Sequence, residues 1–298
     1  MCAMQPPSLW RRQLLWVALA ALGAACDPTL FDPGDLLGNG AGLKAQPPRA
    51  TIVLAHGMGG FRNVGPLDYW FHVPGMWRAQ GARVYVASAT PFASTERRAK
   101  ELRAQLESVP GPFILVGHSQ GALDVRYLVS RLDYARRTVA VVTIAGPHQG
   151  TPLADVLLGH VPGSVMDAAN VLLGVLGWSL DGAQEVTTRY MTQVFNPTVP
   201  DVDGVRYWSV VGRASPLGHE RGTGWLHAMM TPGWTLLKAM GKDSDGAVPI
   251  DSQRWGEVVA TIPADHIGEV NQPFGETPGW HALKFYAELM QKMHDAGW

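Results

Sequence analysis

Ser119 stands at the centre of the sequence Gly-His-Ser-Gln-Gly, between an apolar run and an amphipathic segment. A serine hydroxyl becomes an effective nucleophile when a histidine accepts its proton and a carboxylate orients that histidine. Gly117 and Gly121, two residues before and after the serine, lack a Cβ and so permit a sharp turn from strand to helix. The five-residue pattern is weak by itself, because the chain contains 34 glycines. Its place between a predicted strand and a predicted helix is stronger evidence, and it predicts a nucleophile elbow that exposes Ser119.

The best candidate for the base is His266, one of seven histidines that follow Ser119. It comes after the apolar run EVVATIPA in a loop, so it belongs at the edge of the sheet where the strands end. His281 and His294 belong to a predicted C-terminal helix, where surface or packing roles are more common. His160, His219 and His227 lie in loops or in segments that could cap the site.

An aspartate must orient the histidine, and Asp245 is the strongest candidate. It precedes Gly246 and an apolar pair, in a tight turn at the predicted end of a strand. Asp243 lies two residues earlier, and either aspartate could serve the turn alone, because Asp-Gly is a common turn dipeptide. Asp265 is a poor candidate, because the side chains of adjacent residues diverge in an extended loop. Asp251 is the reserve.

Acyl transfer also needs two backbone N–H groups to bind the oxyanion. One is predicted from Gln120, which follows the nucleophile. The other is predicted from Met58, in the Gly-rich sequence LAHGMGGF after the first strand. The alternative is that His56 and Gly57 form an ordinary turn, but the presence of an elbow elsewhere in the chain favours the oxyanion role.

Apolar strands that alternate with amphipathic helices supply the scaffold for these residues. Continuous apolar runs bounded by turn residues predict strands that are buried on both faces. The helix at 94–109 has apolar residues at helical spacing, Ser94 as its N-cap, and Glu96 four residues before Lys100. The alternation predicts an α/β fold with a doubly wound, mostly parallel sheet and helices on both faces. Strands are predicted at 50–57, 82–88, 113–119, 137–146, 207–215 and 257–264, and further helices at 121–132, 183–195, 234–240 and 279–297.

The first 26 residues depart from this pattern. Arg11 and Arg12 precede a short apolar run and then small residues up to Cys26, which is the layout of an export signal and is too short to span a bilayer. An uncleaved hydrophobic anchor is the alternative. Cys26 resembles the acylated cysteine of bacterial lipoproteins, although Gly23 replaces the usual leucine, and lipidation would tether the chain to a membrane. We therefore expect an exported protein that is secreted, periplasmic or lipid-anchored at the bacterial cell envelope.

Residues 27–50 are rich in Pro, Gly and Asp without an apolar period, which predicts a linker before a catalytic domain at 51–298. The two cysteines are Cys2 and Cys26, and no internal disulfide can form once Cys2 leaves with the signal. The chain has 24 basic and 25 acidic side chains, a net charge of −1. Because no basic stripe stands out, nucleic acid is not an expected partner.

Five sequence motifs together resemble bacterial lipase family I, the pseudomonad-type secreted triacylglycerol lipases. They are IVLAHGMGGFRNVGPLDYWFHVP, VGHSQGALDVRYL, AGPHQGTPLADVL, DSDGAVP and DHIGEVNQPFG. The resemblance runs from about residue 51 to the end and is weakest in the middle. It implies an α/β-hydrolase fold and hydrolysis of lipid esters, with Ser119, Asp245 and His266 as the triad and Met58 and Gln120 as the oxyanion donors.

The resemblance also implies a mobile helical lid, at about 151–182, whose opening at a lipid surface would activate the enzyme. This segment is longer and more apolar than a connection in a minimal sheet requires, although an ordinary buried helix is the alternative. The residues that could cover a pocket are Val161, Val165, Ala168, Val171 and Leu172.

Lipases of this family usually hold a calcium ion near the catalytic histidine, and here the chain departs from the pattern. The expected aspartate two residues after the histidine is Gly268, and the stretch that should supply a second aspartate offers only Glu220. Calcium takes six to eight oxygen ligands, with carboxylates supplying most of the charge. We therefore assign no metal ligand and expect no cofactor, with Glu220 and Asp251 as the residues that could rebuild a shifted site. The family's usual disulfide is also missing, and a folding chaperone is a further partner that the resemblance raises.

The predicted enzyme is a serine carboxylic ester hydrolase, a triacylglycerol lipase that meets its lipid ester at a lipid–water interface. A short-chain carboxylesterase, a polyester depolymerase and an acyltransferase are alternatives, because they share the acyl-enzyme chemistry. A non-catalytic lipid-binding surface lipoprotein is the remaining alternative. The complete set of candidate site residues argues against it.

Overall fold

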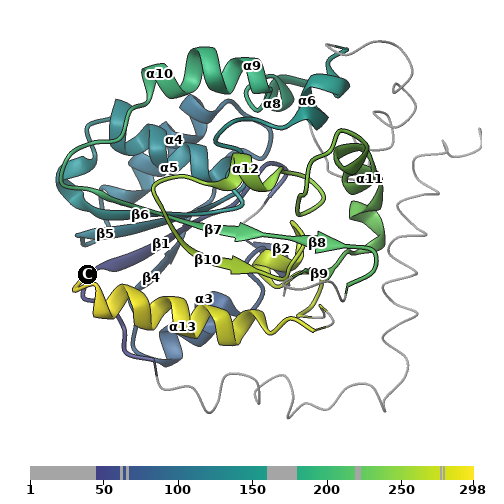
Figure 1. The fold of residues 1–298 in the computed structure, drawn as a ribbon. Coiled ribbons are helices and arrows are strands. Elements are labelled where there is room, and N and C mark those ends of the chain that lie inside the picture. Colours follow the sequence, from purple (N-terminus) through teal and green to yellow (C-terminus); the bar gives the residue numbers. More distant parts are fainter. Residues whose placement is uncertain are drawn as a thin grey trace, which may run out of the picture. The chain divides into compact units, whose positions relative to one another are not determined.

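The computed structural model describes residues 45–298 except 61–62, 65–66, 160–179, 219–222, 276 and 278. Residues Leu43–Trp298 form one compact unit. Its centre is a six-stranded parallel sheet with the order β10-β7-β6-β5-β1-β4 (Figure 1). The predicted α/β fold with a parallel sheet is therefore confirmed. The strands are β1 (Thr51–Ala55), β4 (Val84–Val86), β5 (Phe113–His118), β6 (Thr138–Ile144), β7 (Arg206–Gly212) and β10 (Glu257–Ile262).

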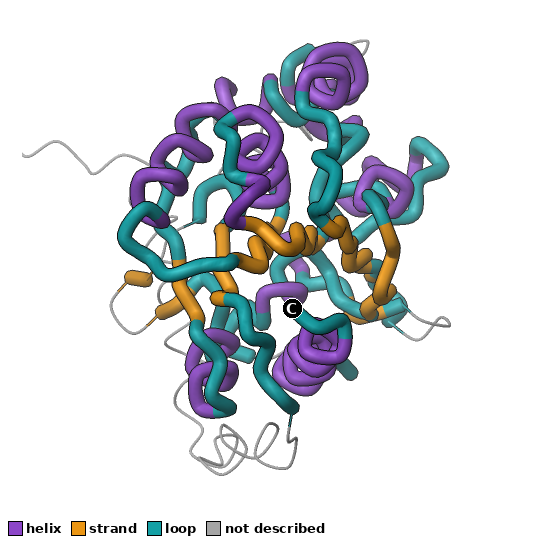
Figure 2. Tube along the Cα trace, turned by 90° about the vertical axis from the view of Figure 1, so that its left-hand side faces the viewer, coloured by secondary structure: helices purple, strands orange, loops and turns teal. Residues whose placement is uncertain are grey.

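Helices cover both faces of this sheet, as the two views show (Figures 1 and 2). Ile52 and Leu54 of β1 face one side and pack with α3 (Val73–Ala79) and α13 (Ala282–Asp295). Val53 and Ala55 face the other side and pack with α4 (Thr95–Leu106) and α5 (Gln120–Arg131). Both faces exclude water, and this is why the central strands are continuous apolar runs without polar alternation.

The helix predicted at 94–109 forms as expected. The side chain of Ser94 caps α4 by accepting a hydrogen bond from the Arg97 backbone N–H at 3.4 Å. Lys100 Nζ lies 2.6 Å from Oε1 of Glu96, which is one helical turn earlier on the exposed face. Such caps and pairs each contribute about 0.3–1 kcal/mol, so the helix depends mainly on its buried face.

Some elements are shorter than predicted, or were not predicted. The segment predicted as one helix at 183–195 consists of α8 (Leu180–Gln184), α9 (Thr188–Tyr190) and a π-helical turn at Met191–Phe195, followed by α10 (Asn196–Thr198). The strand predicted at 207–215 ends at Gly212, and β8 (Ala214–Ser215) pairs instead with β9 (Gly224–Trp225). The remaining helices and strands are α6 (Pro152–Leu157), α11 (Thr231–Ala239), α12 (Ile250–Gln253), the antiparallel pair β2 (Asn63–Val64) and β3 (Leu67–Asp68), and 3-10 turns at Ala135–Arg137, Ala228–Met230 and Gly268–Val270.

Residues 45–50, predicted to end the linker, belong to the folded unit. Pro48 and Ala50 are buried, and the Arg49 backbone N–H donates to the Trp298 carbonyl at 2.5 Å. The folded domain therefore begins before Thr51. The predicted export signal, Cys26, residues 27–44 and the predicted lid residues at 160–179 lie outside the described residues.

In the part of the chain that the structure describes, no helix combines the length and the apolar character needed to cross a membrane.

Candidate active site

Ser119 lies at the sharp turn between β5 and α5. Its backbone has φ 54° and ψ −126°, which is strained for a residue with a Cβ. A Cβ on Gly117 would lie 2.3 Å from the Gly121 carbonyl oxygen, and a Cβ on Gly121 would lie 2.5 Å from the Ala55 carbonyl oxygen. The predicted strand–turn–helix geometry is present. Its two glycines are needed because backbone passes directly against backbone.

The structure brings Ser119, His266 and Asp245 together from three separate loops. His266 Nε2 lies 2.9 Å from Ser119 Oγ, and His266 Nδ1 lies 2.9 Å from Asp245 Oδ2. Ser119 is 9% exposed, His266 8% and Asp245 0%, so charge that develops here is weakly screened by water. With Nδ1–H donating to the carboxylate, Nε2 is free to accept the serine proton. The geometry therefore suits the predicted roles of nucleophile, base and orienting acid.

The Asp245 carboxylate is held in place from several directions. Its Oδ1 accepts hydrogen bonds from the backbone N–H groups of Ala247 and Val248, both at 2.7 Å. Gln253 Nε2 donates to Oδ2 at 3.2 Å, and the His266 backbone N–H donates to the Asp245 carbonyl at 3.0 Å. These contacts leave one face of Oδ2 for the imidazole and prevent the carboxylate from rotating.

Two of the aspartates weighed against Asp245 lie away from the histidine. Asp243 is exposed and forms ion pairs with Arg213 at 3.0 Å and Lys238 at 2.9 Å. Asp251 is exposed in the first turn of α12. The preference for Asp245 thus agrees with the arrangement of side chains.

The other described histidines weighed as the base occupy different places in the fold. His148 is buried and hydrogen-bonded through both ring nitrogens. His281 precedes α13, and His294 within α13 donates to a backbone carbonyl. His160 and His219 lie outside the described residues.

The loop that carries Met58 passes directly beside the nucleophile. A Cβ on Gly57 would lie 2.8 Å from the Ser119 Cβ, so only glycine fits there. Gln120 is fully buried at the start of α5, and its side-chain amide donates to the Ala93 carbonyl at 3.1 Å. Both predicted oxyanion donors therefore belong to segments that adjoin Ser119.

His56 supports this oxyanion loop from within. The Ala89 backbone N–H donates to His56 Nε2 at 3.0 Å, which leaves Nδ1–H to donate to the Gly57 carbonyl at 2.9 Å. Burial, helped by the nearby Arg98 charge, lowers the pKa of His56 to about 4. The imidazole is therefore neutral near pH 7, as this tautomer requires.

Arg98 of α4 supports the same loop from the helix side, and sequence reasoning did not single it out. The fully buried guanidinium donates to the His56 carbonyl at 2.6 Å, to the Thr90 carbonyl at 3.1 Å and to Asp124 Oδ2 at 2.8 Å. Burial raises the pKa of Asp124 to about 7, although the arginine charge opposes the rise. The sequence feature that could have revealed Arg98 is its position on the apolar stripe of α4, four residues before Leu102.

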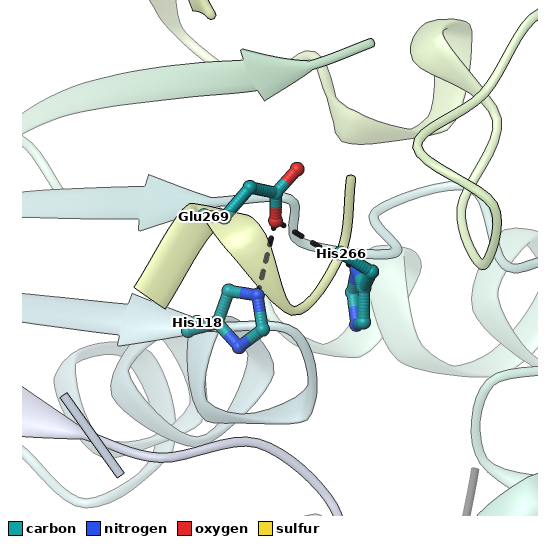
Figure 3. Close-up of side chains that lie close together, drawn as sticks. All are labelled: His118, His266 and Glu269. Atoms are coloured by element: carbon teal, nitrogen blue, oxygen red, sulfur yellow. Dashed lines mark hydrogen bonds and ion pairs between the residues drawn. The ribbon is translucent and has the colours of Figure 1, made fainter. Parts of the chain in front are cut away.

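Two more titratable side chains, His118 and Glu269, lie beside His266 and were not predicted as site residues (Figure 3). Glu269 Oε2 lies 3.0 Å from His118 Nε2 and 3.7 Å from His266 Nδ1. Burial lowers the pKa of His118 well below its usual value, and burial with the nearby Asp245 charge raises that of Glu269 well above it. The signals in the sequence were that His118 belongs to the elbow motif and that Glu269 shares a loop with His266.

His118, His266 and Glu269 also form a possible metal-ligand group among the described residues, with ligand atoms within 4.8 Å of one another. These atoms already face hydrogen-bond partners. A metal ion would have to draw His266 Nδ1 away from Asp245 Oδ2, 2.9 Å distant. The arrangement is better explained as a hydrogen-bonded network.

The position expected to supply a calcium ligand has no room for one. A Cβ on Gly268 would lie 2.9 Å from Thr277 Oγ1 and 3.1 Å from Asp265 Oδ1. Asp265 is buried and accepts hydrogen bonds from the backbone and Nδ1 of His227, at 2.6 Å and 2.8 Å, and from the Gly268 backbone at 2.9 Å. N–H donors repel a cation, so the described residues of this loop do not fit calcium. The Asp265 carboxylate thus faces His227 and the Gly268 backbone and not its neighbour His266, as predicted. Glu220, the other residue considered for calcium, lies outside the described residues.

Comparison with known proteins shows that the chain is similar to lipases in sequence and in structure. No family model matches the chain. It is 29% identical over 266 residues to a triacylglycerol lipase of Vibrio cholerae, covering 76% of this chain and 81% of that protein. It is 26% identical over 288 residues to a triacylglycerol lipase of Pseudomonas fragi, covering 84% and 97%. A solved structure of a Bacillus licheniformis lipase in its mature form superposes with a TM-score of 0.63 at 20% identity, covering 84% of this chain and 92% of that one. The structural likeness shows a shared α/β-hydrolase fold.

Proposed function

We infer that this chain is a lipase of the α/β-hydrolase superfamily, and that it hydrolyses carboxylic esters of lipids through a serine acyl-enzyme. The observation that carries the reaction class is the pair of 2.9 Å contacts that join Ser119 to His266 and His266 to Asp245 at a strained elbow. The lipid character of the substrate is supported by the similar sequences, which are named triacylglycerol lipases.

The reaction follows from this geometry in two acyl-transfer steps. His266 Nε2 accepts the proton of Ser119 Oγ as the oxygen attacks the ester carbonyl, and Asp245 stabilises the imidazolium that forms. The oxyanion accepts hydrogen bonds from the backbone N–H groups of Met58 and Gln120, each of which stabilises the transition state by about 3–4 kcal/mol. The alcohol leaves with the proton from His266. Water then attacks the acyl-serine with His266 as base again, and the fatty acid is released.

The substrate class is tested with a series of nitrophenyl esters of increasing acyl length and with a long-chain triacylglycerol emulsion. We expect kcat/KM to rise at least about tenfold from acetyl to medium and long acyl groups, because an apolar pocket gains about 0.8 kcal/mol for each CH₂ that it buries. We also expect fatty acid release from the emulsion. A maximum at acetyl or butyryl esters with no release would indicate the short-chain carboxylesterase, and acyl transfer to an added alcohol in preference to water would indicate the acyltransferase.

We further propose that the enzyme works without calcium. Gly268 offers no carboxylate, and the Asp265 oxygens already accept N–H donors. Treatment with excess chelator should therefore change neither the rate of ester hydrolysis nor the melting temperature. Magnesium and calcium added back separately to chelated enzyme provide the control. A loss of activity that calcium alone restores would contradict this proposal.

A further inference from the structure

A second string of hydrogen bonds runs beside the catalytic contacts. The Gly57 backbone N–H donates to Tyr69 Oη at 3.1 Å, Tyr69 Oη lies 2.6 Å from His118 Nδ1, and His118 Nε2 lies 3.0 Å from Glu269 Oε2. We propose that Tyr69 is a positioning residue, which holds the oxyanion loop and the loop of the catalytic histidine in one hydrogen-bonded unit. The proposal rests on the proposed ester hydrolysis.

The hydrogens in the string have a consistent direction. The Tyr69 hydroxyl accepts from Gly57 and donates to His118 Nδ1. A neutral His118 then carries its hydrogen on Nε2 and donates to Glu269. His118 is neutral because it is fully buried, which lowers its pKa. Each group in the string thus donates to the next, from the oxyanion loop to the Glu269 carboxyl group.

At one end, the string fixes the direction of the Met58 N–H. A Cβ on Gly57 would lie 2.8 Å from both Tyr69 Oη and the Ser119 Cβ, so the phenol meets the loop beside the nucleophile. Tyr69 holds the N–H of Gly57, and His56 Nδ1 holds its carbonyl at 2.9 Å. The Gly57 carbonyl and the Met58 N–H share one planar trans peptide and point in opposite directions. Holding both polar groups of Gly57 therefore aims the Met58 donor.

At the other end, the string reaches the loop of the base. Glu269 lies three residues after His266, and its Oε2 is 3.7 Å from His266 Nδ1 (Figure 3). The Tyr286 hydroxyl donates to the Glu269 carbonyl at 2.7 Å. A Cβ on Gly212 would lie only 1.6 Å from Glu269 Oε1, so the carboxyl group packs tightly between the sheet and the two histidines. This confinement lets the string transmit the position of one loop to the other.

A positioning role and a purely structural role predict different kinetics. Hydrogen bonds to an oxyanion are made in the transition state and hardly at all to the bound ester, so a misdirected Met58 N–H lowers kcat and leaves KM nearly unchanged. A structural role lowers the melting temperature and the fraction of active enzyme. Because the members act as one string, breaking it twice should cost little more than breaking it once.

The test is a double-mutant cycle on a medium-chain nitrophenyl ester, with active sites counted by fluorophosphonate labelling. Its two variants are Tyr69→Phe and Glu269→Met, and the methionine removes the oxygen that accepts from His118 Nε2. We expect each single variant to lower kcat about tenfold, with KM within about twofold of wild type, and the double variant to match the worse single variant. The matched control is Tyr85→Phe, since the Tyr85 hydroxyl bonds only weakly to Gln105, at 3.4 Å, at the edge of α4. It should keep wild-type kcat.

Three results would overturn the inference. They are a wild-type kcat in Tyr69→Phe, an effect of that variant on KM alone, and a double variant that loses about a hundredfold. If Glu269→Met does not fold, His118→Asn completes the cycle with Tyr69→Phe, with the same expected and overturning results. A wild-type enzyme that hydrolyses no ester of the series would instead overturn the proposed function, so the two failures can be distinguished.

Discussion

Replacing Ser119 by alanine should lower kcat for ester hydrolysis by about 10⁴- to 10⁶-fold and leave the fold intact. In the proposed reaction the Oγ atom is the attacking group, and it lies 2.9 Å from the nitrogen that would take its proton. Loss of a triad serine leaves only the binding and oxyanion contributions to catalysis. Alanine keeps the Cβ that the elbow already accommodates, so no new clash arises. The measurement is kcat on a nitrophenyl ester, with near- and far-ultraviolet circular dichroism to verify the fold.

The matched control for this experiment is Ser215→Ala. Ser215 is also buried, and its Oγ has no hydrogen-bond partner among the described residues. Its removal should leave kcat within about twofold of wild type, as for substitutions that break no interaction. If Ser119→Ala keeps wild-type hydrolysis, a different residue must form the acyl-enzyme.

Replacing Asp245 by asparagine should lower kcat near pH 7 by about 10⁴-fold, the loss known for this change in a serine triad. The reason lies in the contacts of the carboxylate. Its Oδ1 accepts N–H groups from Ala247 and Val248, so the amide oxygen of asparagine must stay on that side. The NH₂ group then faces His266 Nδ1 and forces the hydrogen of the imidazole onto Nε2. That tautomer cannot accept the proton of Ser119.

Asp243→Asn is the control for the acid, because Asp243 lies two residues away and its side chain forms ion pairs with Lys238 and Arg213 at the surface. It should retain activity within about twofold, as is usual for exposed ion pairs. Stopped-flow or steady-state hydrolysis at pH 7 suffices for both variants. If the loss appears in Asp243→Asn and not in Asp245→Asn, the assignment of the acid is wrong.

The parts of the site that could be predicted are those that local sequence determines. The elbow at Ser119 depends on a strand, a turn and a helix that are consecutive in the chain, so glycine spacing and apolar pattern reveal it. His266 could be placed because it follows a predicted strand, and parallel strands end at the same edge of a sheet. Asp245 could be placed because it stands in an Asp-Gly turn before an apolar pair. The six strands of the sheet and the main helices were predictable because their apolar patterns are also local features of the sequence.

The supporting residues could not be predicted, because their roles arise from contacts between distant segments. Glu269 and His118 are separated by 151 residues, and Tyr69 meets His118 across 49. An arginine on an apolar stripe, such as Arg98, resembles a surface residue until the loop that it binds is seen. The break of the helix predicted at 183–195 into short pieces also reflects tertiary packing, which overrides intrinsic propensity.

The backbone conformation of Ser119 places catalysis and thermal stability in opposition. A side chain at φ 54° and ψ −126° costs about 1–3 kcal/mol, and glycine would occupy the same turn without that cost. A laboratory evolution that scored only heat resistance would therefore enrich glycine at position 119 and lose the nucleophile. Screens for thermostable variants thus need turnover as a second criterion, because the residue that destabilises the turn is the proposed nucleophile.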